Sequence, residues 1–175
     1  TATMNNPTID VLSENLLQHP SIWVVMQRVQ KRMEAERTDR QHFYEIMEEN
    51  KKMEFINGEV YFQSPVTLRH NKATGFLYRL LSIYVDRKKL GFVGIEKILI
   101  SLTRNDYEPD ICFFGNDKAL HFTASQKQFP APDFVVEVLS PSTEQHDRHL
   151  KMEDYAAHDI DEYWLIDPEK QTVEQ

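Results

Sequence analysis

The stretch PDFVVEVLSPST, residues 132–143, places one acidic side chain inside an otherwise apolar run. Asp133–Leu139 is typical of a strand buried on both faces. The SPST that follows is typical of a helix start, and we expect this helix to reach about His158. Because an unpaired buried carboxylate is energetically costly, Glu137 needs either a structural ion pair or a metal-binding or catalytic role.

A second acidic residue, Asp110, follows Glu108-Pro109 and begins a short apolar strand that ends at Phe114. A turn-capping aspartate is the simpler interpretation. The functional one is that Asp110 and Glu137 lie on adjacent strands and face one site. Two such carboxylates suit Mg²⁺, which prefers oxygen ligands and keeps several waters.

A basic residue, Lys151, lies on the helix predicted after Glu137, one turn beyond Asp147. This spacing is that of an ordinary Asp–Lys pair on a helix surface. Alternatively, the same face lines the site, where an ammonium group orients attacking water and opposes charge on a phosphate.

Upstream, the apolar period is that of a strand on both sides of Asn57-Gly58, which predicts a hairpin of Lys52–Ile56 and Glu59–Gln63. With a two-residue turn, Glu54 faces Tyr61 and lies on the more polar face of the hairpin. Before the hairpin, apolar residues at helical spacing predict one helix from about Ile22, and a capping pattern predicts a second one starting at Thr38.

Between the hairpin and Asp110, the pattern predicts a helix over His70–Lys89, capped by Gly91, and a long strand over Phe92–Leu102. A last strand covers Glu162–Asp167. The order of elements indicates a mixed α/β domain with a central sheet. The expected buried stripe of the His70–Lys89 helix comprises Ala73, Phe76 or Leu77, Leu80, and Ile83 or Tyr84.

The composition narrows the function classes. The 175 residues suffice for one core, and the single cysteine, Cys112, excludes a disulfide framework and a cysteine-rich zinc site. We find no apolar run long enough for a membrane span and no signal peptide, so we expect a cytoplasmic protein. P-loop, dinucleotide-binding and nucleophile-elbow motifs are absent, which leaves no support for a nucleotide cofactor.

The charge is unevenly distributed along the chain, although it sums to −8. Residues 51–100 carry nine basic and four acidic side chains, whereas residues 101–175 carry six basic and sixteen acidic ones. The net negative charge argues mildly against a protein that coats nucleic acid. The acidic C-terminal part is either a solvated surface or a magnesium site.

Six strings occur in the following order along the chain: EFINGEVYFQSP, RHN, EPDICFF, PDFVVEVLSPST, DRHLKMEDY and DEYWLIDP. Read together, they resemble the Uma-type family of putative restriction endonucleases within the PD-(D/E)XK nuclease superfamily. The resemblance covers about Thr38 to Pro168, so residues 1–37 are expected to be a helical extension and residues 38–175 the nuclease domain. It implies a restriction-endonuclease-like fold, a mixed sheet flanked by helices, and Mg²⁺-dependent hydrolysis of DNA phosphodiesters.

The resemblance also assigns residues. It implies that Asp110, Glu137 and Glu54 are catalytic ligands of Mg²⁺, which Mn²⁺ can replace, with a backbone carbonyl of residue 138 as a further ligand. The position two after Glu137, a lysine in the superfamily pattern, is Leu139. The catalytic lysine is therefore expected on the next helix, as Lys151, with Lys97 as the fallback.

His70 matches a histidine of the family. With Lys72 it is expected to contact the nucleic acid, although a capping or surface histidine explains it equally well.

Other functions compatible with these residues are a catalytically silent nuclease fold that serves as a DNA-binding or protein-assembly module, and a resolvase of the same fold that acts on branched DNA. Cutting both strands with one site per subunit generally needs two subunits. Because the N-terminal helices offer apolar faces, a homodimer is expected.

Overall fold

The computed structural model describes residues 7–48 and 50–175. The chain forms two compact units, one up to Tyr44 and one from Glu45 onward. The predicted boundary between residues 1–37 and 38–175 stays a prediction. Among the helices of the described residues, none combines the length and the apolar character that crossing a bilayer requires.

The N-terminal unit is helical. Helix α1 spans Pro7–Leu17, and helix α2 spans Ile22–Ile46, beginning where the sequence predicts. The predicted second helix start at Thr38 is wrong, because α2 continues through it. The Thr38 hydroxyl donates a hydrogen bond to the Glu34 carbonyl one turn earlier in α2. Thr38 is therefore a residue in the middle of a helix and does not cap a helix start.

The second unit contains two five-stranded mixed sheets where one central sheet was expected. The first sheet has the order β2-β1-β5-β4-β7. The predicted hairpin and its register are confirmed, since Glu54 pairs with Tyr61 and Phe55 with Val60. The strands of this sheet are β1 (Met53–Ile56), β2 (Glu59–Phe62), β4 (Leu99–Ser101), β5 (Asp106–Tyr107) and β7 (Gln128–Phe129).

The second sheet has the order β10-β9-β8-β6-β3 and contains the strands that the sequence places around Asp110 and Glu137. Strand β8 pairs antiparallel with β6 and parallel with β9. The mixed α/β class is thereby confirmed. The strands are β3 (Gly91–Ile95), β6 (Ile111–Gly115), β8 (Phe134–Val138), β9 (Glu162–Asp167) and β10 (Thr172–Glu174).

The strand predicted over Phe92–Leu102 is two strands that belong to different sheets. The chain turns at Glu96, whose φ of 55° lies in the left-handed region, and its amide donates to the Asp110 carbonyl. This turn directs β3 into one sheet and β4 into the other. Because β-branched and apolar residues continue on both sides of Glu96, the periodicity alone does not reveal the break.

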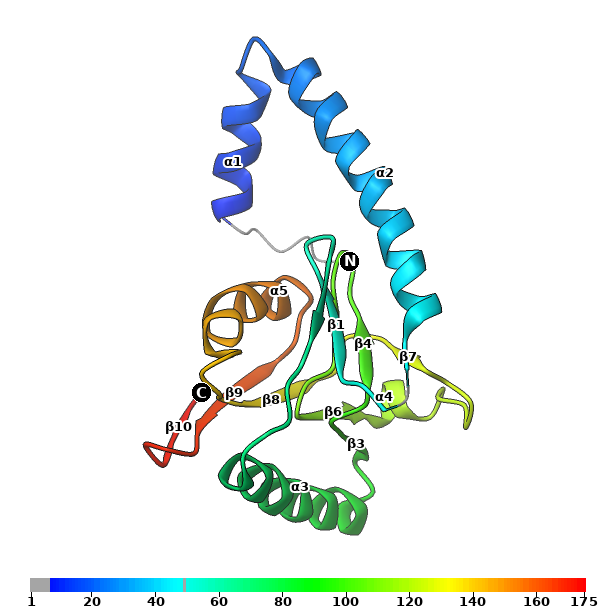
Figure 1. Cartoon of the computed structure of the whole chain (residues 1–175), viewed down its shortest axis with the longest axis vertical. Helices are drawn as coiled ribbons and strands as arrows, with labels where there is room; N and C mark the ends of the chain where they lie inside the picture. Colours follow the sequence, from blue (N-terminus) through cyan, green and yellow to red (C-terminus); the bar gives the residue numbers. More distant parts are fainter. Residues whose placement is uncertain (1–6, 49) are drawn as a thin grey trace. The chain divides into compact units, whose positions relative to one another are not determined.

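The second sheet separates two hydrophobic layers. On one face, Cys112 and Val135 pack with Ile100 and Tyr107 of the first sheet and with Tyr155 of α5 (Met152–Ala157). On the opposite face, Ile111 and Val136 pack against helix α3 (Leu68–Lys88). Figure 1 shows α3 on one side of β6 and β8 and α5 on the other. The fold also includes the short helix α4 (Asn116–Ala119).

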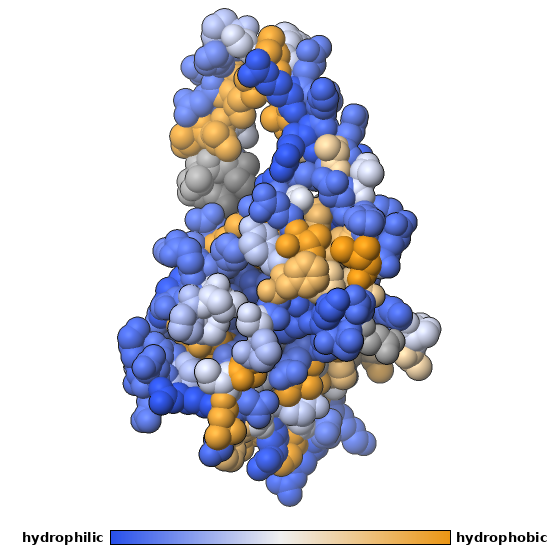
Figure 2. All heavy atoms as spheres, viewed as in Figure 1, coloured by the Kyte–Doolittle hydropathy of each residue, from blue (hydrophilic) through white to orange (hydrophobic). Residues whose placement is uncertain are grey.

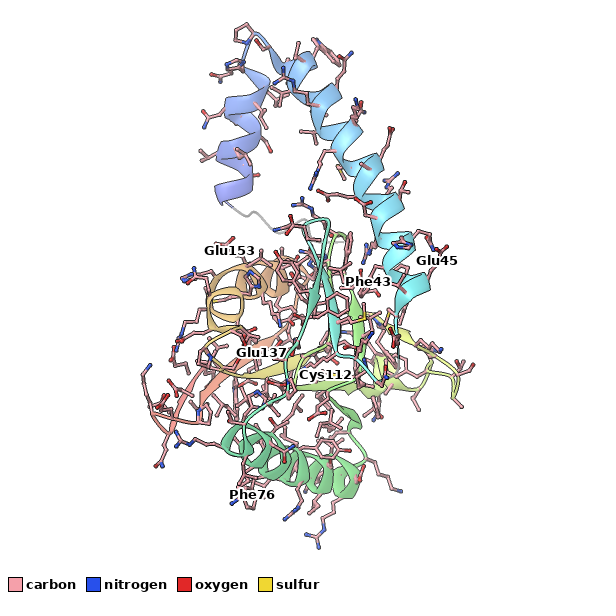
Figure 3. All side chains as sticks on the ribbon, in the orientation of Figure 1. Phe43, Glu45, Phe76, Cys112, Glu137 and Glu153 are labelled. Atoms are coloured by element: carbon pink, nitrogen blue, oxygen red, sulfur yellow. The ribbon has the colours of Figure 1, made fainter. Side chains whose placement is uncertain are left out.

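Of the buried stripe predicted for helix α3, the alternative Leu77 is confirmed, but the rest of the buried face differs from the prediction. Leu77, Leu81 and Val85 pack on the sheet, whereas Phe76, Leu80, Ile83 and Tyr84 are exposed. Figure 3 shows Phe76 pointing away from the sheet. The helix has two apolar stripes, and the sequence does not decide which one is buried. The predicted cap is also wrong, because Lys89, with φ of 55°, terminates the helix and Gly91 begins β3.

Candidate active site

Asp110 and Glu137 lie side by side on adjacent strands, as predicted. Ile111 of β6 pairs with Val136 of β8, and this register brings the two acidic residues together. The Asp110 amide donates to Glu137 Oε2 at 3.3 Å, and the Val138 amide donates to Asp110 Oδ2 at 2.8 Å. Both carboxylates are buried, and these two backbone amides fix their orientation.

Lys151 reaches Glu137 from a π-helix, η1 (His146–Lys151), which precedes α5. Its Nζ lies 2.9 Å from Glu137 Oε1, 2.9 Å from Glu54 Oε1 and 3.1 Å from Asp147 Oδ1. The fallback residue, Lys97, is elsewhere: its Nζ contacts Glu108 and the Lys51 carbonyl. π-Helical turns occur frequently at functional sites, where they redirect side chains.

Strand β1 and the residue just before it contribute two charged side chains to the cluster. Glu54 is buried instead of lying on a polar face, because both faces of β1 are covered, and its Oε1 also accepts from the Glu108 amide at 3.1 Å. Lys52, which the sequence analysis missed, places its Nζ 2.8 Å from Asp110 Oδ1. Its alternation with Glu54 along the hairpin is the signal that could have identified it.

The two residues predicted to contact nucleic acid lie in different environments. His70 is buried, and its Nε2 lies 3.2 Å from Asp110 Oδ2. Its Nδ1 has no hydrogen-bond partner within residues 7–48 and 50–175. Lys72, by contrast, is exposed at the edge of the cleft. The structure therefore places His70 beside the acidic centre and Lys72 outside it.

Three tyrosines that the sequence analysis did not single out surround the cluster. The Tyr155 hydroxyl donates to Glu137 Oε1 at 3.4 Å, and the Tyr163 hydroxyl donates to the Asp147 carbonyl at 2.9 Å. The ring of Tyr107 lies 5.5 Å from the Lys151 ammonium, within the range of a cation–π contact. They close the inner side of the site against water.

Asp110, Glu137, Asp147 and Lys151 form the floor of a cleft of about 1050 Å³. Glu54 and Lys52 contact these residues without lining the cleft. Figure 3 shows Glu137 between β8 and the helical segment that carries Lys151. The rim carries a hydroxyl-rich segment between β8 and η1 and side chains of both charges. It includes the basic Arg69, Lys72 and Lys170, the acidic Glu144, Asp167 and Glu169, and the hydroxyl groups of Ser140, Ser142 and Thr143. Arg69 lies 4.0 Å from Glu169, and Lys170 lies 3.0 Å from Asp167. The basic groups of this rim suit contacts with a polyanion whose reacting group approaches a cation at the floor.

The two neighbouring carboxyl groups, Asp110 and Glu137, have pKa values shifted in opposite directions. Burial opposes the charged form of Asp110, but His70 and Lys52 outweigh it and hold the pKa of this carboxyl well below its usual range. Burial raises the pKa of Glu137 to about 8, against the attraction of Lys151. Although burial opposes its charge too, the pKa of Lys151 is well above its usual value because of its carboxylate neighbours. Three carboxylates share this one ammonium group, so the excess proton falls on Glu137.

Stability should therefore decrease as the pH rises in the absence of metal. Because the folded protein binds the Glu137 proton more tightly than the unfolded chain, this contribution is complete below pH 4.5 and is lost as the pH rises through about 8. The raised pKa of buried Glu108 acts in the same direction. Urea unfolding with EDTA at about pH 6 and about pH 9 measures the difference. Glu137→Gln should reduce it, and an unchanged difference would contradict the assignment.

The donor set fits a hard divalent cation in its chemistry. The cluster holds four carboxylates (Glu54, Asp110, Glu137, Asp147) and two ammonium groups (Lys52, Lys151), which leaves two excess negative charges when all are ionised and His70 is neutral. Over the described residues, no three His, Cys, Asp or Glu side chains converge on one metal position. The two ammonium groups lie between the oxygens that would bind the ion. Carboxylate oxygens and retained water are what Mg²⁺ prefers.

Comparisons with known proteins give a consistent result. The model of the Uma2 family, described as a putative restriction endonuclease, matches residues 40–175. An uncharacterized protein of Synechocystis sp. is 32% identical over 119 residues, and the match spans 66% of each chain, just under two thirds of that relative. A putative nuclease belonging to DUF820 from Anabaena variabilis has the same fold, with a TM-score of 0.67 at 22% identity over 75% of this chain and 74% of its own.

Proposed function

This chain belongs to the Uma2 family of putative restriction endonucleases, and from that premise we propose that it is a Mg²⁺-dependent endonuclease that hydrolyses DNA phosphodiester bonds. The observation that carries the proposal is the convergence of Asp110, Glu137 and Lys151 on the floor of a cleft, with Glu54 in contact with Lys151. Buried carboxylates with a cation among them at the bottom of a cleft are typical of catalytic sites.

The residues of the acidic cluster have different roles in the proposed reaction. Asp110 and Glu137 would hold the ion, with Glu54 as a further ligand directly or through water. A bound Mg²⁺ supplies Lewis-acid stabilisation of charge on the phosphate and makes water more acidic. Lys151 orients the attacking water and opposes negative charge on the phosphate. Tyr155 and Asp147 position Glu137 and Lys151 through the contacts described above.

The rim of the cleft binds the rest of the nucleic acid. Lys72 and Arg69, in the first turns of α3, and Lys170, after β9, contact the phosphates that flank the reacting one. Such contacts position the strand without reading its sequence. His70 acts differently from the expectation of a phosphate contact, because its Nε2 holds the Asp110 carboxylate.

The test of the nuclease is cleavage of supercoiled plasmid by the purified protein with Mg²⁺, with Mn²⁺ and with EDTA. We expect nicked or linear product with either ion and none with EDTA. A folded protein that binds the plasmid and cuts it under none of these conditions would favour the silent, DNA-binding interpretation. Preference for a four-way junction over linear duplex would favour a resolvase.

We further propose that the enzyme is a homodimer formed through the N-terminal helices. Ile22, Met26, Val29 and Met33 follow the four-three-four spacing of a coiled-coil seam on α2. Met26, Val29 and Met33 are exposed, and Figure 2 shows apolar side chains along this helical pair. Because a helix pair without a buried seam is marginal in water, a second copy supplies the missing cover.

Sedimentation at micromolar protein should give the mass of two chains. Replacing Met26 and Met33 by Glu should yield a monomer, because two charges would enter the seam of each helix. Gln27→Glu with Lys31→Gln, on the same exposed helix but outside the seam, makes the same change in net charge, is the matched control and should remain dimeric. A wild-type monomer, or equal dissociation of both variants, would show that this seam does not join two copies.

A further inference from the structure

The Lys52 ammonium forms an ion pair with Asp110 Oδ1, whereas the other carboxylate oxygen, Oδ2, accepts from a backbone amide. Asp110 Oδ2 already accepts from the Val138 amide and lies against His70, whereas Oδ1 lies 2.8 Å from Lys52 Nζ. Lys52 and Glu54 share one side of β1 because they are two residues apart. The strand therefore presents an ammonium group and a carboxylate to the same small volume.

Lys52 is held less firmly than Lys151. The Lys151 side chain is 1% exposed and lies within ion-pair distance of three carboxylates. The Lys52 side chain is 16% exposed, and its short contact is with a single carboxylate. Since a lysine ammonium is a mobile point charge on a flexible stem, Lys52 is the cation that can move out while Lys151 stays.

We propose that Lys52 is a built-in counter-ion that occupies Asp110 when no divalent cation is bound and leaves it when one binds. The inference rests on the proposed metal dependence of the site. Neutralising a buried carboxylate in the metal-free protein avoids an unpaired buried charge. The same ammonium competes with the incoming ion, so Lys52 lowers the metal affinity and withholds the active state until the cation concentration is high enough to displace it.

Chemical footprinting of the wild-type protein tests the movement directly. Lysines are acetylated briefly with and without MgCl₂, and the modified positions are quantified by mass spectrometry. Acetylation of Lys52 should increase several-fold with MgCl₂, because its amine leaves the carboxylate and meets solvent. Lys51, which is exposed and paired with Glu48, is the matched control and should react equally in both samples. An unchanged or slower reaction of Lys52 would overturn the proposal.

Metal affinity provides the second readout. Lys52→Met should bind Mn²⁺ about tenfold more tightly than wild type in calorimetry, because a competing charge is gone. Its melting temperature should be lower than wild type in EDTA and should recover with saturating Mn²⁺. Lys51→Met makes the same change one residue away and should leave both quantities unchanged. Mn²⁺ binding by Lys52→Met that is equal to or weaker than that by Lys51→Met would contradict competition.

The two proposals fail differently. If Lys52 responds to the ions as described and no DNA is cut, the counter-ion role holds and the nuclease proposal fails. If DNA is cut with Mg²⁺ while the Lys52 footprint and the Mn²⁺ affinity of Lys52→Met do not change, the nuclease holds and the counter-ion role fails. If neither the wild-type protein nor Lys52→Met binds Mn²⁺ at millimolar concentration, the counter-ion role is wrong.

Discussion

Asp110→Asn should abolish metal-dependent plasmid cleavage, with a loss of about 1,000-fold or more in the single-turnover rate. The amide keeps the size of the carboxylate but loses the charge that would hold the ion. It can still accept from the Val138 amide, so the local geometry is preserved. Initial rates of supercoil loss at saturating Mg²⁺ measure the effect, together with melting curves that establish folding.

Asp117→Asn is the control for this change. It removes the same charge from an exposed position on α4, which does not line the cleft, and should cut plasmid at the wild-type rate. A folded Asp110→Asn protein that retains a tenth or more of the activity would remove Asp110 from the catalytic centre.

Lys151→Met should destabilise the protein by about 3–5 kcal/mol, because three buried carboxylates lose the cation that they share. Its Nζ lies within 3.1 Å of all three. Urea unfolding in EDTA gives the free energy. The deficit should become smaller as the pH is lowered, since protonation removes the repulsion among the carboxylates.

Lys170→Met provides the comparison. Lys170 also forms an ion pair, 3.0 Å from Asp167, but its side chain is 68% exposed. A solvated pair of this kind contributes little to stability, because water and salt screen the attraction between the two charges. If Lys151→Met loses no more stability than Lys170→Met, the ammonium does not neutralise the floor, and its proposed role in catalysis loses its basis.

Local turn chemistry explains why the hairpin could be predicted to the register. Asn57 has a φ of 52° and Gly58 a φ of 89°, so both central residues adopt the left-handed conformations that a type I′ turn requires. Asn-Gly is the dipeptide that tolerates them best. The strands around Glu137 were equally predictable, since a buried strand shows itself as a continuous apolar run.

Features decided by long-range packing were not predictable in this way. The capping pattern at Thr38 also fits a helix interior, and the two apolar stripes of α3 are alternatives that only the packed sheet distinguishes. The turn at Glu96 depends on the hydrogen bond from its amide to the carbonyl of Asp110, the residue that directly precedes β6. At α3 and at Glu96, a contact distant in sequence overrides a local preference, whereas the hydrogen bond of Thr38 is local and its capping pattern is ambiguous in itself.

The same distinction applies to the site. Asp110 and Glu137 attracted attention as charges inside apolar strands, and the structure brings them together with Lys151 and Glu54. Lys52 and Tyr155 carry no such anomaly, because a lysine near a turn and an aromatic residue on a helix are ordinary in sequence. Their proximity to the acidic floor arises from pairing between strands and from the π-helix.

The distance along the chain between Glu54 and Lys151 has a consequence for synthesis. Their side chains meet across 97 residues, and Asp110 and Glu137 enter between them. Closing such long loops occurs late in folding. A nascent chain emerging from the ribosome therefore carries an incomplete centre until Lys151 has been translated and its helix has folded back onto the first hairpin. In a refolding reaction, the return of cleavage should follow the last tertiary contact rather than the recovery of secondary structure.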